Sequence, residues 1–186
     1  MSLLFEAGRE LQNSLETRGW RFCFIGGLAV LRWGEPRFTR DIDVTLLCPF
    51  GSEDSISIPL LDAGYLARIS EVREFARRNR VLLLQTPNGI PVDIALGALP
   101  FEERMIERST LFEFEPGSVL RTCSAEDLVI LKLFAFRARD LADAETVAIR
   151  HSAALDWDYI RANLDSLAEV KGEPGIMAAL EKLRKG

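Results

Sequence analysis

Two apolar segments of this chain contain aspartates at positions where a buried strand normally has hydrophobic residues. They are Asp41–Val44 and Val92–Ile94. Because successive side chains of a strand point to opposite faces, Asp41 and Asp43 project on one side, and the apolar residues between and after them pack on the other. Aspartate is disfavoured in the middle of a strand, so Asp93 also needs a reason to be there. Solvent exposure is one reason, and a chemical role in a shared site is the other.

The three carboxylates suit a divalent cation if they meet on one face of a sheet. Carboxylates this close repel each other unless water or a cation lies between them, and carboxylate oxygens are ligands that Mg²⁺ prefers. Asp41, Asp43 and Asp93 together have enough oxygens to hold two Mg²⁺ ions about 4 Å apart, which clamp the attacking and leaving oxygens in phosphoryl-type transfer. The three aspartates are therefore candidate metal ligands.

A strand that runs into two glycines and then a helix precedes the first aspartates. Phe22–Ile25 is short, apolar and aromatic, and it is followed by Gly26 and Gly27. Leu28–Trp33 then has a helical pattern. Glycines let a phosphate approach the backbone, and the first turn of a helix offers unpaired N–H groups at the positive end of its dipole. The pair also fits a simple turn, and its spacing matches neither the dinucleotide-binding nor the P-loop pattern.

Hydrophobic periodicity and turn residues divide the remaining chain into short elements. We expect helices over residues 3–18, 28–33, 55–64, 71–79 and 101–109, and strands over 22–25, 41–47, 81–86, 90–96, 111–115 and 118–121. After Ser124, which has the pattern of a helix cap, helices are expected over 128–138, 140–150, 156–169 and 174–185. The sequence therefore predicts an α/β (α+β) fold. A mixed β-sheet flanked by helices forms a core over residues 1–121, and a helical C-terminal part over 122–186 packs on it.

Composition argues against several classes of protein. His151 is the only histidine, which removes most zinc sites and makes a Ser–His–Asp mechanism unsuitable. The three cysteines are scattered and indicate reduced core thiols in a reducing compartment. A net charge of −5 argues against a protein that wraps duplex DNA. The N-terminus has no basic region and no apolar run is long enough to span a bilayer, so we expect a cytoplasmic protein without membrane association.

Taken together, the order of these segments resembles the polymerase-beta-like nucleotidyltransferase superfamily. Its pattern is a glycine pair after a strand, then an Asp-x-Asp between apolar residues, then a lone acid in a later strand. Gly26–Val30, followed by Gly34 and then Arg37–Asp43, looks most like the small bacterial members. These include the abortive-infection and type IV toxin group and the aminoglycoside nucleotidyltransferases. Many members have a serine beside the glycines, and this chain does not.

The C-terminal part extends the resemblance. Residues 126–132, Arg139–Asp140 and Asp143 are similar to the lysine motif and the later Arg/Asp motif of the toxin-like group. Lys132, Arg139 and Asp143 are spaced by seven and four residues, so they share one face if the helix is continuous. That face has two interpretations: contact of Lys132 with a triphosphate, or an ordinary solvated helix surface.

The resemblance implies a Mg²⁺-dependent nucleotidyltransferase that moves an NMP group from an NTP to an acceptor hydroxyl and releases pyrophosphate. By resemblance, Asp41 and Asp43 hold the ion that carries the triphosphate, and Asp93 joins them on a second ion that activates the acceptor, with Mn²⁺ as an alternative to Mg²⁺. Lys132 counts as catalytic because it offsets developing charge. The implied nucleotide-binding residues are Gly26, Gly27, Arg40, Lys132 and Arg139. The acceptor fits an RNA end, a protein hydroxyl or a small molecule.

Other interpretations fit parts of the same pattern. Asp41–Thr45 also fits the Asp-x-Asp-x-Thr motif of haloacid-dehalogenase-like phosphatases, but that family needs an apolar strand before its first aspartate, and Arg37–Arg40 stands there instead. A second alternative is a nucleotidyltransferase-fold antitoxin or adaptor that acts by binding a partner protein, and a partner toxin or antitoxin is compatible with both roles. Arg37 and Arg40 either neutralise phosphate charge or only offset the charges of the nearby aspartates.

Overall fold

The computed structural model describes residues 2–185, which form two compact units. Unit 1 comprises residues 2–28 and 38–123, and unit 2 comprises residues 29–37 and 124–185. The chain therefore leaves unit 1 just after the glycine pair and returns to it just before the first aspartates. The division between residues 121 and 122 that the sequence suggests stays a prediction.

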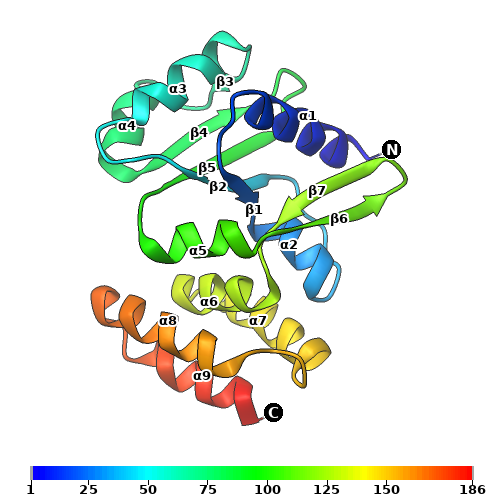
Figure 1. The fold of residues 1–186 in the computed structure, drawn as a ribbon, viewed down its shortest axis with the longest axis vertical. Coiled ribbons are helices and arrows are strands. Elements are labelled where there is room, and N and C mark those ends of the chain that lie inside the picture. Colours follow the sequence, from blue (N-terminus) through cyan, green and yellow to red (C-terminus); the bar gives the residue numbers. More distant parts are fainter. Residues whose placement is uncertain (1, 186) are drawn as a thin grey trace. The chain divides into compact units, whose positions relative to one another are not determined.

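A mixed sheet forms the centre of unit 1. The described residues give it seven strands, in the order β3-β4-β5-β2-β1-β7-β6 (Figure 1). The strands are β1 (Phe22–Phe24), β2 (Ile42–Leu47), β3 (Leu66–Ala67), β4 (Val81–Gln85), β5 (Pro91–Gly97), β6 (Thr110–Glu115) and β7 (Ser118–Thr122). β2 pairs with β5 and β1 with β7 in parallel, and the other neighbours pair antiparallel. The predicted α/β fold with a mixed sheet is confirmed.

Helices flank this sheet along its length. They are α1 (Leu3–Thr17), α3 (Glu53–Asp62), α4 (Val72–Asn79) and α5 (Pro100–Arg108), while α2 (Gly26–Trp33) begins in unit 1 and continues in unit 2. α1 packs against β7, where the Gln12 side chain donates to the Val119 carbonyl (3.2 Å) and accepts from the Arg121 N–H (2.9 Å). α4 packs against β4, and α5 packs against β1 and β2.

The centre of the sheet has one buried face and one partly open face. The buried face carries alternate residues of β2, β4 and β5, namely Ile42, Val44, Leu82, Leu84, Val92 and Ile94, all without solvent exposure. Asp43, Leu83 and Asp93 lie on the other face and are partly exposed. The alternation predicted for the aspartate strands is therefore correct. We call the side that carries Asp43, Leu83 and Asp93 the open face.

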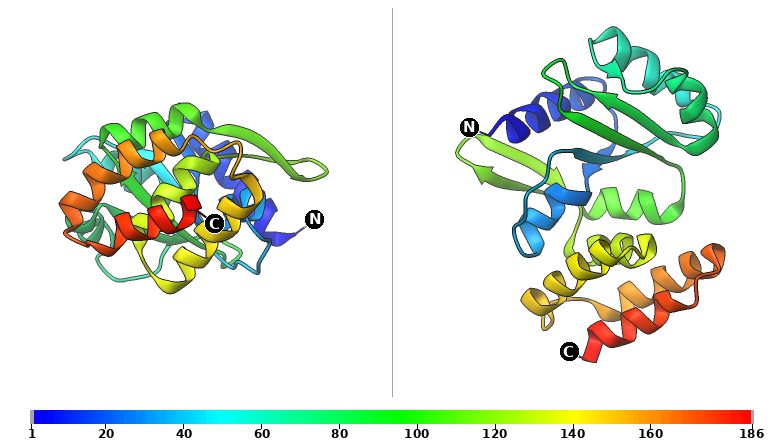
Figure 2. Two further views of the ribbon diagram at one scale, coloured as in Figure 1. Left: turned by 90° about the horizontal axis from the view of Figure 1, so that it is seen from below. Right: turned by 180° about the vertical axis from the view of Figure 1, so that it is seen from behind.

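The two edges of the sheet are short or exposed. β3 has only two residues and lies between the helices that the sequence predicted over 55–64 and 71–79. At the other edge, the β6–β7 hairpin projects beyond the rest of unit 1 (Figure 2). Leu111 and Phe112 of β6 are 51% and 38% exposed.

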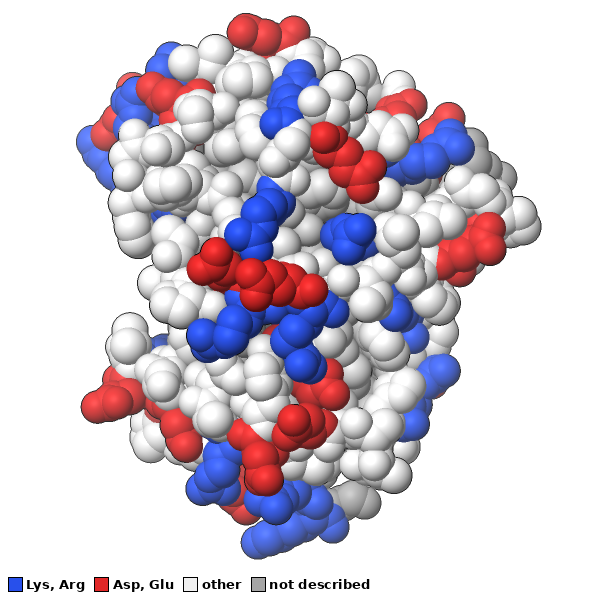
Figure 3. Space-filling view, in the orientation of Figure 1, with Lys and Arg blue, Asp and Glu red and all other residues white. Residues whose placement is uncertain are grey.

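Acidic and basic side chains are interspersed over α5 (Figure 3), where Arg21 pairs with Glu103 and Glu107.

Unit 2 is helical. It contains the larger part of α2 together with α6 (Ala125–Ala135), α7 (Ala138–His151), α8 (Trp157–Lys171) and α9 (Gly175–Lys185). The predicted cap at Ser124 is confirmed, because its Oγ accepts from the Asp127 N–H (3.1 Å). α6 packs against α7 and α8, and α9 packs against α7 and α8. Within residues 2–185, no helix is long and apolar enough to cross a membrane.

The helix expected over 128–138 is wrong at its C-terminal end. α6 ends at Ala135, Phe136 adopts a left-handed conformation with φ of 59°, and α7 begins at Ala138. A bulky residue with positive φ is uncommon and ends a helix because it reverses the local backbone twist. Lys132 on α6 and Asp143 on α7 therefore do not share one continuous helix.

Candidate active site

Asp43 and Asp93 are direct neighbours on the open face. β2 and β5 run parallel, and Asp43 is the register partner of Asp93. Adjacent strands lie about 4.8 Å apart, so two carboxylates in this arrangement repel each other unless something compensates. Burial is the main reason that the pKa of Asp93 lies above its usual range, and the negative charge of Asp41 raises it further. The structure thus brings Asp93 close to both predicted partners.

Asp43 lies directly against the glycine pair. A Cβ on Gly26 would lie 1.9 Å from Asp43 Oδ2, and the φ of Gly26 is +54°. A Cβ on Gly27 would lie 2.2 Å from Thr39 Oγ1. Both distances are far below van der Waals contact, so any side chain at either position displaces these neighbours. The sequence suggested glycines that admit a phosphate, and the structure adds a second reason: they admit Asp43 and Thr39.

Asp43 also lies at the N-terminus of α2. The Gly27 N–H donates to Asp43 Oδ2 over 3.4 Å, which is a long hydrogen bond. The positive end of a helix dipole stabilises a carboxylate in this place. The start of α2 therefore compensates part of the negative charge that Asp43 brings to the open face.

The loop before β2 orients Asp41. Thr39 Oγ1 donates to Asp41 Oδ1 over 2.9 Å. Asp41 and Arg40 are both exposed, and the Arg40 guanidinium lies over the Phe38 ring, 5.1 Å from its centroid. Thr39 thus connects Gly27 with Asp41. The role of Thr39 was missed in the sequence, although its position two residues before Asp41 was a usable signal.

Arg68 forms an ion pair with Asp93. Arg68 follows β3 directly, and its guanidinium contacts Asp93 Oδ1. The two side chains are 28% and 37% exposed, so the pair is only partly shielded from water. The Arg68 charge lowers the pKa of Asp93 and works against the effect of burial. Nothing in the sequence pointed to Arg68, because it lies in a stretch with no recognisable pattern.

The donor chemistry of the three aspartates fits a divalent ion. As the side chains stand, no three His, Cys, Asp or Glu residues within residues 2–185 are arranged to hold a metal. The available donors are nevertheless carboxylate oxygens, the ligands that hard divalent cations take. A cation already lies against one of them, because the Arg68 guanidinium contacts Asp93. By charge and donor type, the site therefore suits a divalent ion, and the predicted ligand set stays a prediction.

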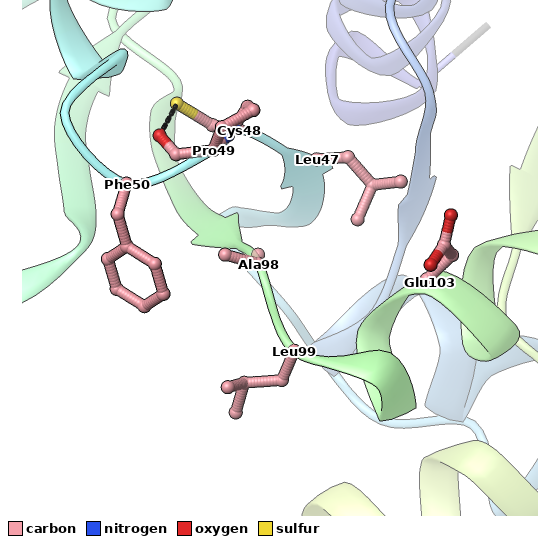
Figure 4. Close-up of a pocket in the computed structure, with 8 residues that line it drawn as sticks. Leu47, Cys48, Pro49, Phe50, Ala98, Leu99 and Glu103 are labelled. Atoms are coloured by element: carbon pink, nitrogen blue, oxygen red, sulfur yellow. Dashed lines mark hydrogen bonds between the residues drawn. The ribbon is translucent and has the colours of Figure 1, made fainter.

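A separate cavity lies at the opposite ends of the same strands. Its volume is about 310 Å³, and it is lined by Leu47, Cys48, Pro49, Phe50, Gly97, Ala98, Leu99 and Glu103 (Figure 4). Leu47 and Gly97 are the last residues of β2 and β5, whereas Asp43 and Asp93 lie near their beginnings. This mainly apolar cavity is therefore distinct from the carboxylate site.

Lys132 is buried in unit 2 between two carboxylates. Its Nζ lies 2.9 Å from Asp140 Oδ1 and 2.8 Å from Asp143 Oδ2, and the residue is only 8% exposed. Of the two interpretations of this face, an ordinary solvated helix surface is therefore wrong for Lys132. The sequence did not predict this burial, because it depends on the break at Phe136, which brings α7 back against α6. Arg139 is exposed in the first turn of α7.

Each of the two carboxylates that contact Lys132 also forms an ion pair with an arginine. Arg37 binds Asp143 through two hydrogen bonds, from Nε (2.7 Å) and Nη2 (2.8 Å). Arg137 contacts Asp140. Burial alone would raise the pKa of both aspartates, but hydrogen bonds from the arginines and from Lys132 outweigh it, so both pKa values lie below their usual range. Arg37 thus contacts Asp143, a partner that the sequence did not suggest.

We call Lys132, Asp140, Asp143, Arg37 and Arg137 the unit 2 charge network. It contains three positive and two negative side chains, all connected by ion pairs. Removing one partner of a buried ion pair is strongly destabilising, because it leaves a buried charge uncompensated. Arg37, the last residue of unit 2 before the aspartate loop, is connected to α7 through this network.

The sequence as a whole decides the family. The profile of the family described as "Nucleotidyl transferase AbiEii toxin, Type IV TA system" matches residues 11–184. The chain belongs to the AbiEii family. This match includes both units and every candidate residue above, and it confirms the resemblance to the toxin-like group. No curated protein matches the sequence.

Solved structures confirm the fold of this AbiEii chain. An antigenic nucleotidyltransferase-like protein from Paracoccidioides brasiliensis is 14% identical, with a TM-score of 0.57, over 96% of this chain and 92% of the other. The antibiotic-resistance factor ANT(2'')-Ia is 10% identical, with a TM-score of 0.59, over 91% and 93%. The lincosamide antibiotic adenylyltransferase LnuA is 15% identical, with a TM-score of 0.50, over 79% and 96%. At these identities the likeness establishes the nucleotidyltransferase fold.

We expect Gly26→Ala to destabilise the protein beyond the ordinary cost of alanine at positive φ. The new methyl group would overlap Asp43 Oδ2, and such overpacking typically costs about 1–3 kcal/mol. Gly51→Ala is the matched control, because Gly51 also has positive φ (+83°) but no atom within 4 Å of the point where a Cβ would lie. Urea unfolding of both variants measures the difference. Equal losses for the two would contradict the close contact of Asp43 with Gly26.

We expect Lys132→Met to destabilise the protein by about 3–5 kcal/mol at neutral pH, because it leaves two buried carboxylates without the ammonium. The pKa values of Asp140 and Asp143 are lowered in the folded wild type, so their contribution is present above about pH 4 and is lost as the pH falls through the folded values. The wild-type advantage should therefore shrink on acidification.

Denaturant unfolding at several pH values tests this prediction. Arg137→Met is the control, because the Arg137 side chain is 78% exposed and its loss should cost much less. A Lys132→Met variant as stable as the wild type at neutral pH would contradict the buried network.

Proposed function

We propose that this chain is a Mg²⁺-dependent nucleotidyltransferase that moves an NMP group from an NTP to an acceptor hydroxyl and releases pyrophosphate. The observation that carries the proposal is the register of Asp43 and Asp93 on adjacent parallel strands, with Asp41 close enough to raise the pKa of Asp93. The fold does not require carboxylates here, and their repulsion costs stability. Membership of the AbiEii nucleotidyltransferase family supports the same function.

The three aspartates would have different roles, two of them on the nucleotide side of the reaction and one on the acceptor side. Asp41 and Asp43 come from one segment and would hold the ion that accompanies the triphosphate. Asp93 comes from another strand and would serve the acceptor side. Bound Mg²⁺ supplies neutralisation of phosphate charge and a lowered pKa of the acceptor hydroxyl. Thr39 keeps Asp41 oriented through its hydrogen bond.

The start of α2 would serve the triphosphate. Gly26 and Gly27 have no side chains, and the first N–H groups of α2 point toward the carboxylate site, where Asp43 now accepts one of them. A phosphate oxygen would take a similar place, because the positive end of the helix suits any anion. Arg40 is exposed on the adjoining loop and would add positive charge.

Two of the predicted nucleotide-binding residues, Lys132 and Arg139, lie in unit 2. Arg139 is exposed in the first turn of α7. Lys132 would have to exchange Asp140 or Asp143 for a phosphate oxygen, since both of these carboxylates now hold its ammonium. We keep Lys132 and Arg139 as nucleotide ligands within this proposal.

The acceptor is an RNA end, a protein hydroxyl or a small molecule. Two proteins with the same fold are named as an antibiotic-resistance factor and a lincosamide antibiotic adenylyltransferase, whereas the family profile names a toxin of a type IV toxin–antitoxin system. These names favour different acceptors. The family description supports an antitoxin as a partner.

Transfer of labelled nucleotide tests the proposal. The protein is incubated with each α-labelled NTP, Mg²⁺ or Mn²⁺, and separate pools of cellular RNA, protein and aminoglycoside or lincosamide antibiotics. We expect one pool to become labelled with release of pyrophosphate. An adaptor or antitoxin that only binds a partner would label none of them, and that result would overturn the proposal.

We expect substitutions of the three aspartates to affect nucleotide binding and turnover differently. Asp41→Asn and Asp43→Asn should weaken nucleotide binding and turnover together, whereas Asp93→Asn should keep most nucleotide binding and lose turnover by orders of magnitude. Each variant keeps the size of the side chain, and Asp62→Asn, at an exposed site on α3, is the control for the substitution itself. Metal-dependent nucleotide binding and single-turnover transfer are measured for each protein. Wild-type transfer by Asp93→Asn would contradict the assignment.

A further inference from the structure

Arg68 reaches Asp93 across a neighbouring strand. The Arg68 N–H donates to the Leu83 carbonyl of β4 over 3.1 Å, and Leu83 is the register partner of Asp93 on β5. Arg68, Leu83, Asp93 and Asp43 therefore form one row across the open face. The guanidinium crosses Leu83 to end at the carboxylate of Asp93.

The segment that carries Arg68 is not part of the core. β3 has two residues at the edge of the sheet, and Leu66 is 49% exposed. Ile69, directly after Arg68, is 36% exposed, and Glu71 adopts a left-handed conformation with φ of 52°. The Arg68 side chain itself is partly exposed. It can therefore leave Asp93 without disturbing a packed side chain.

The charge of Arg68 is also in the right place to oppose a metal ion. Asp93 is partly buried and feels the negative charge of Asp41, which makes an unpaired carboxylate costly there. The guanidinium relieves that cost in the chain without a metal. A divalent ion that binds Asp93 competes with this cation, because two positive charges held close together on one carboxylate repel each other.

We propose that Arg68 is a displaceable counter-cation, a positioning residue that holds Asp93 while the site has no divalent ion and competes with that ion for the carboxylate. This proposal rests on the proposed function, because it assigns a divalent ion to Asp93. Arg68 thereby raises the cation concentration at which the site becomes complete. A purely structural ion pair would instead stabilise the fold and leave cation binding unchanged.

Binding of Mn²⁺ alone, without nucleotide, tests the proposal by isothermal titration calorimetry and by the electron paramagnetic resonance of the free ion. We expect Arg68→Gln to bind Mn²⁺ about three- to tenfold more tightly than the wild type, since a partly exposed ion pair no longer competes. Its unfolding midpoint without metal should fall at the same time. Arg68→Lys keeps the charge and should stay within about twofold of the wild-type affinity.

Two controls separate this role from a general effect of charge. Arg78→Gln removes one positive charge from an exposed pair with Glu74 on α4 and should leave the Mn²⁺ affinity unchanged. In an Asp93→Asn background, Arg68→Gln should no longer tighten Mn²⁺ binding, because the competition is for Asp93 itself.

Equal or weaker Mn²⁺ binding by Arg68→Gln, with normal binding by the wild type, would overturn the proposal and leave the proposed function intact. If neither protein binds Mn²⁺ while both remain folded, the assignment of a divalent ion to the aspartates fails, and this inference fails with it.

Discussion

The repulsion between carboxylates on the open face is the constraint on which the arrangement of unit 1 depends. Asp43 and Asp93 are held in register by parallel pairing of β2 and β5, and the apolar residues beside them are fully buried. Neither strand can shift by one residue to separate the charges, because that would bring the apolar side chains to the open face. The surroundings must therefore compensate the charge where it stands.

The negative charge of each aspartate is compensated by a different group. Asp43 lies against Gly26 at the positive end of α2, Asp41 accepts a hydrogen bond from Thr39, and Asp93 pairs with Arg68. Two of these groups are close in sequence to the aspartate segment, namely the start of α2 and the loop that contains Thr39. The third is a long side chain on an exposed edge segment. The compensation is therefore local on the side that we assign to the nucleotide, and it comes from a distant segment on the side that we assign to the acceptor.

Sequence patterns predicted the parts of the structure that follow from local rules. The alternation of aspartates with apolar residues indicated the open face, and the glycine pair before a helix indicated a close approach to the backbone. The order of these segments identified the family, which the profile over residues 11–184 confirms. Only the reason for the glycines was incomplete, because the contact of Gly26 with Asp43 depends on how β2 lies beside α2.

The parts that the sequence did not predict depend on contacts between distant residues. The Arg68–Asp93 pair joins residues 25 positions apart across β4, and no local pattern marks it. The burial of Lys132 follows from the break at Phe136, where a phenylalanine takes a conformation that favours glycine. Helical spacing predicted that Lys132, Arg139 and Asp143 share one face if the helix is continuous, whereas the break turns Lys132 inward between Asp140 and Asp143.

The most direct test of the central claim is the free energy of unfolding of the wild-type protein with and without Mn²⁺ and each NTP. If the carboxylates of the open face form a site for a cation and a nucleotide, the correct pair of ligands should stabilise the fold by about 2.7 kcal/mol at 100 times its Kd. An Asp41→Asn, Asp43→Asn double variant should lose that gain. An unfolding free energy of the wild type that no NTP changes in the presence of Mn²⁺ would contradict the account.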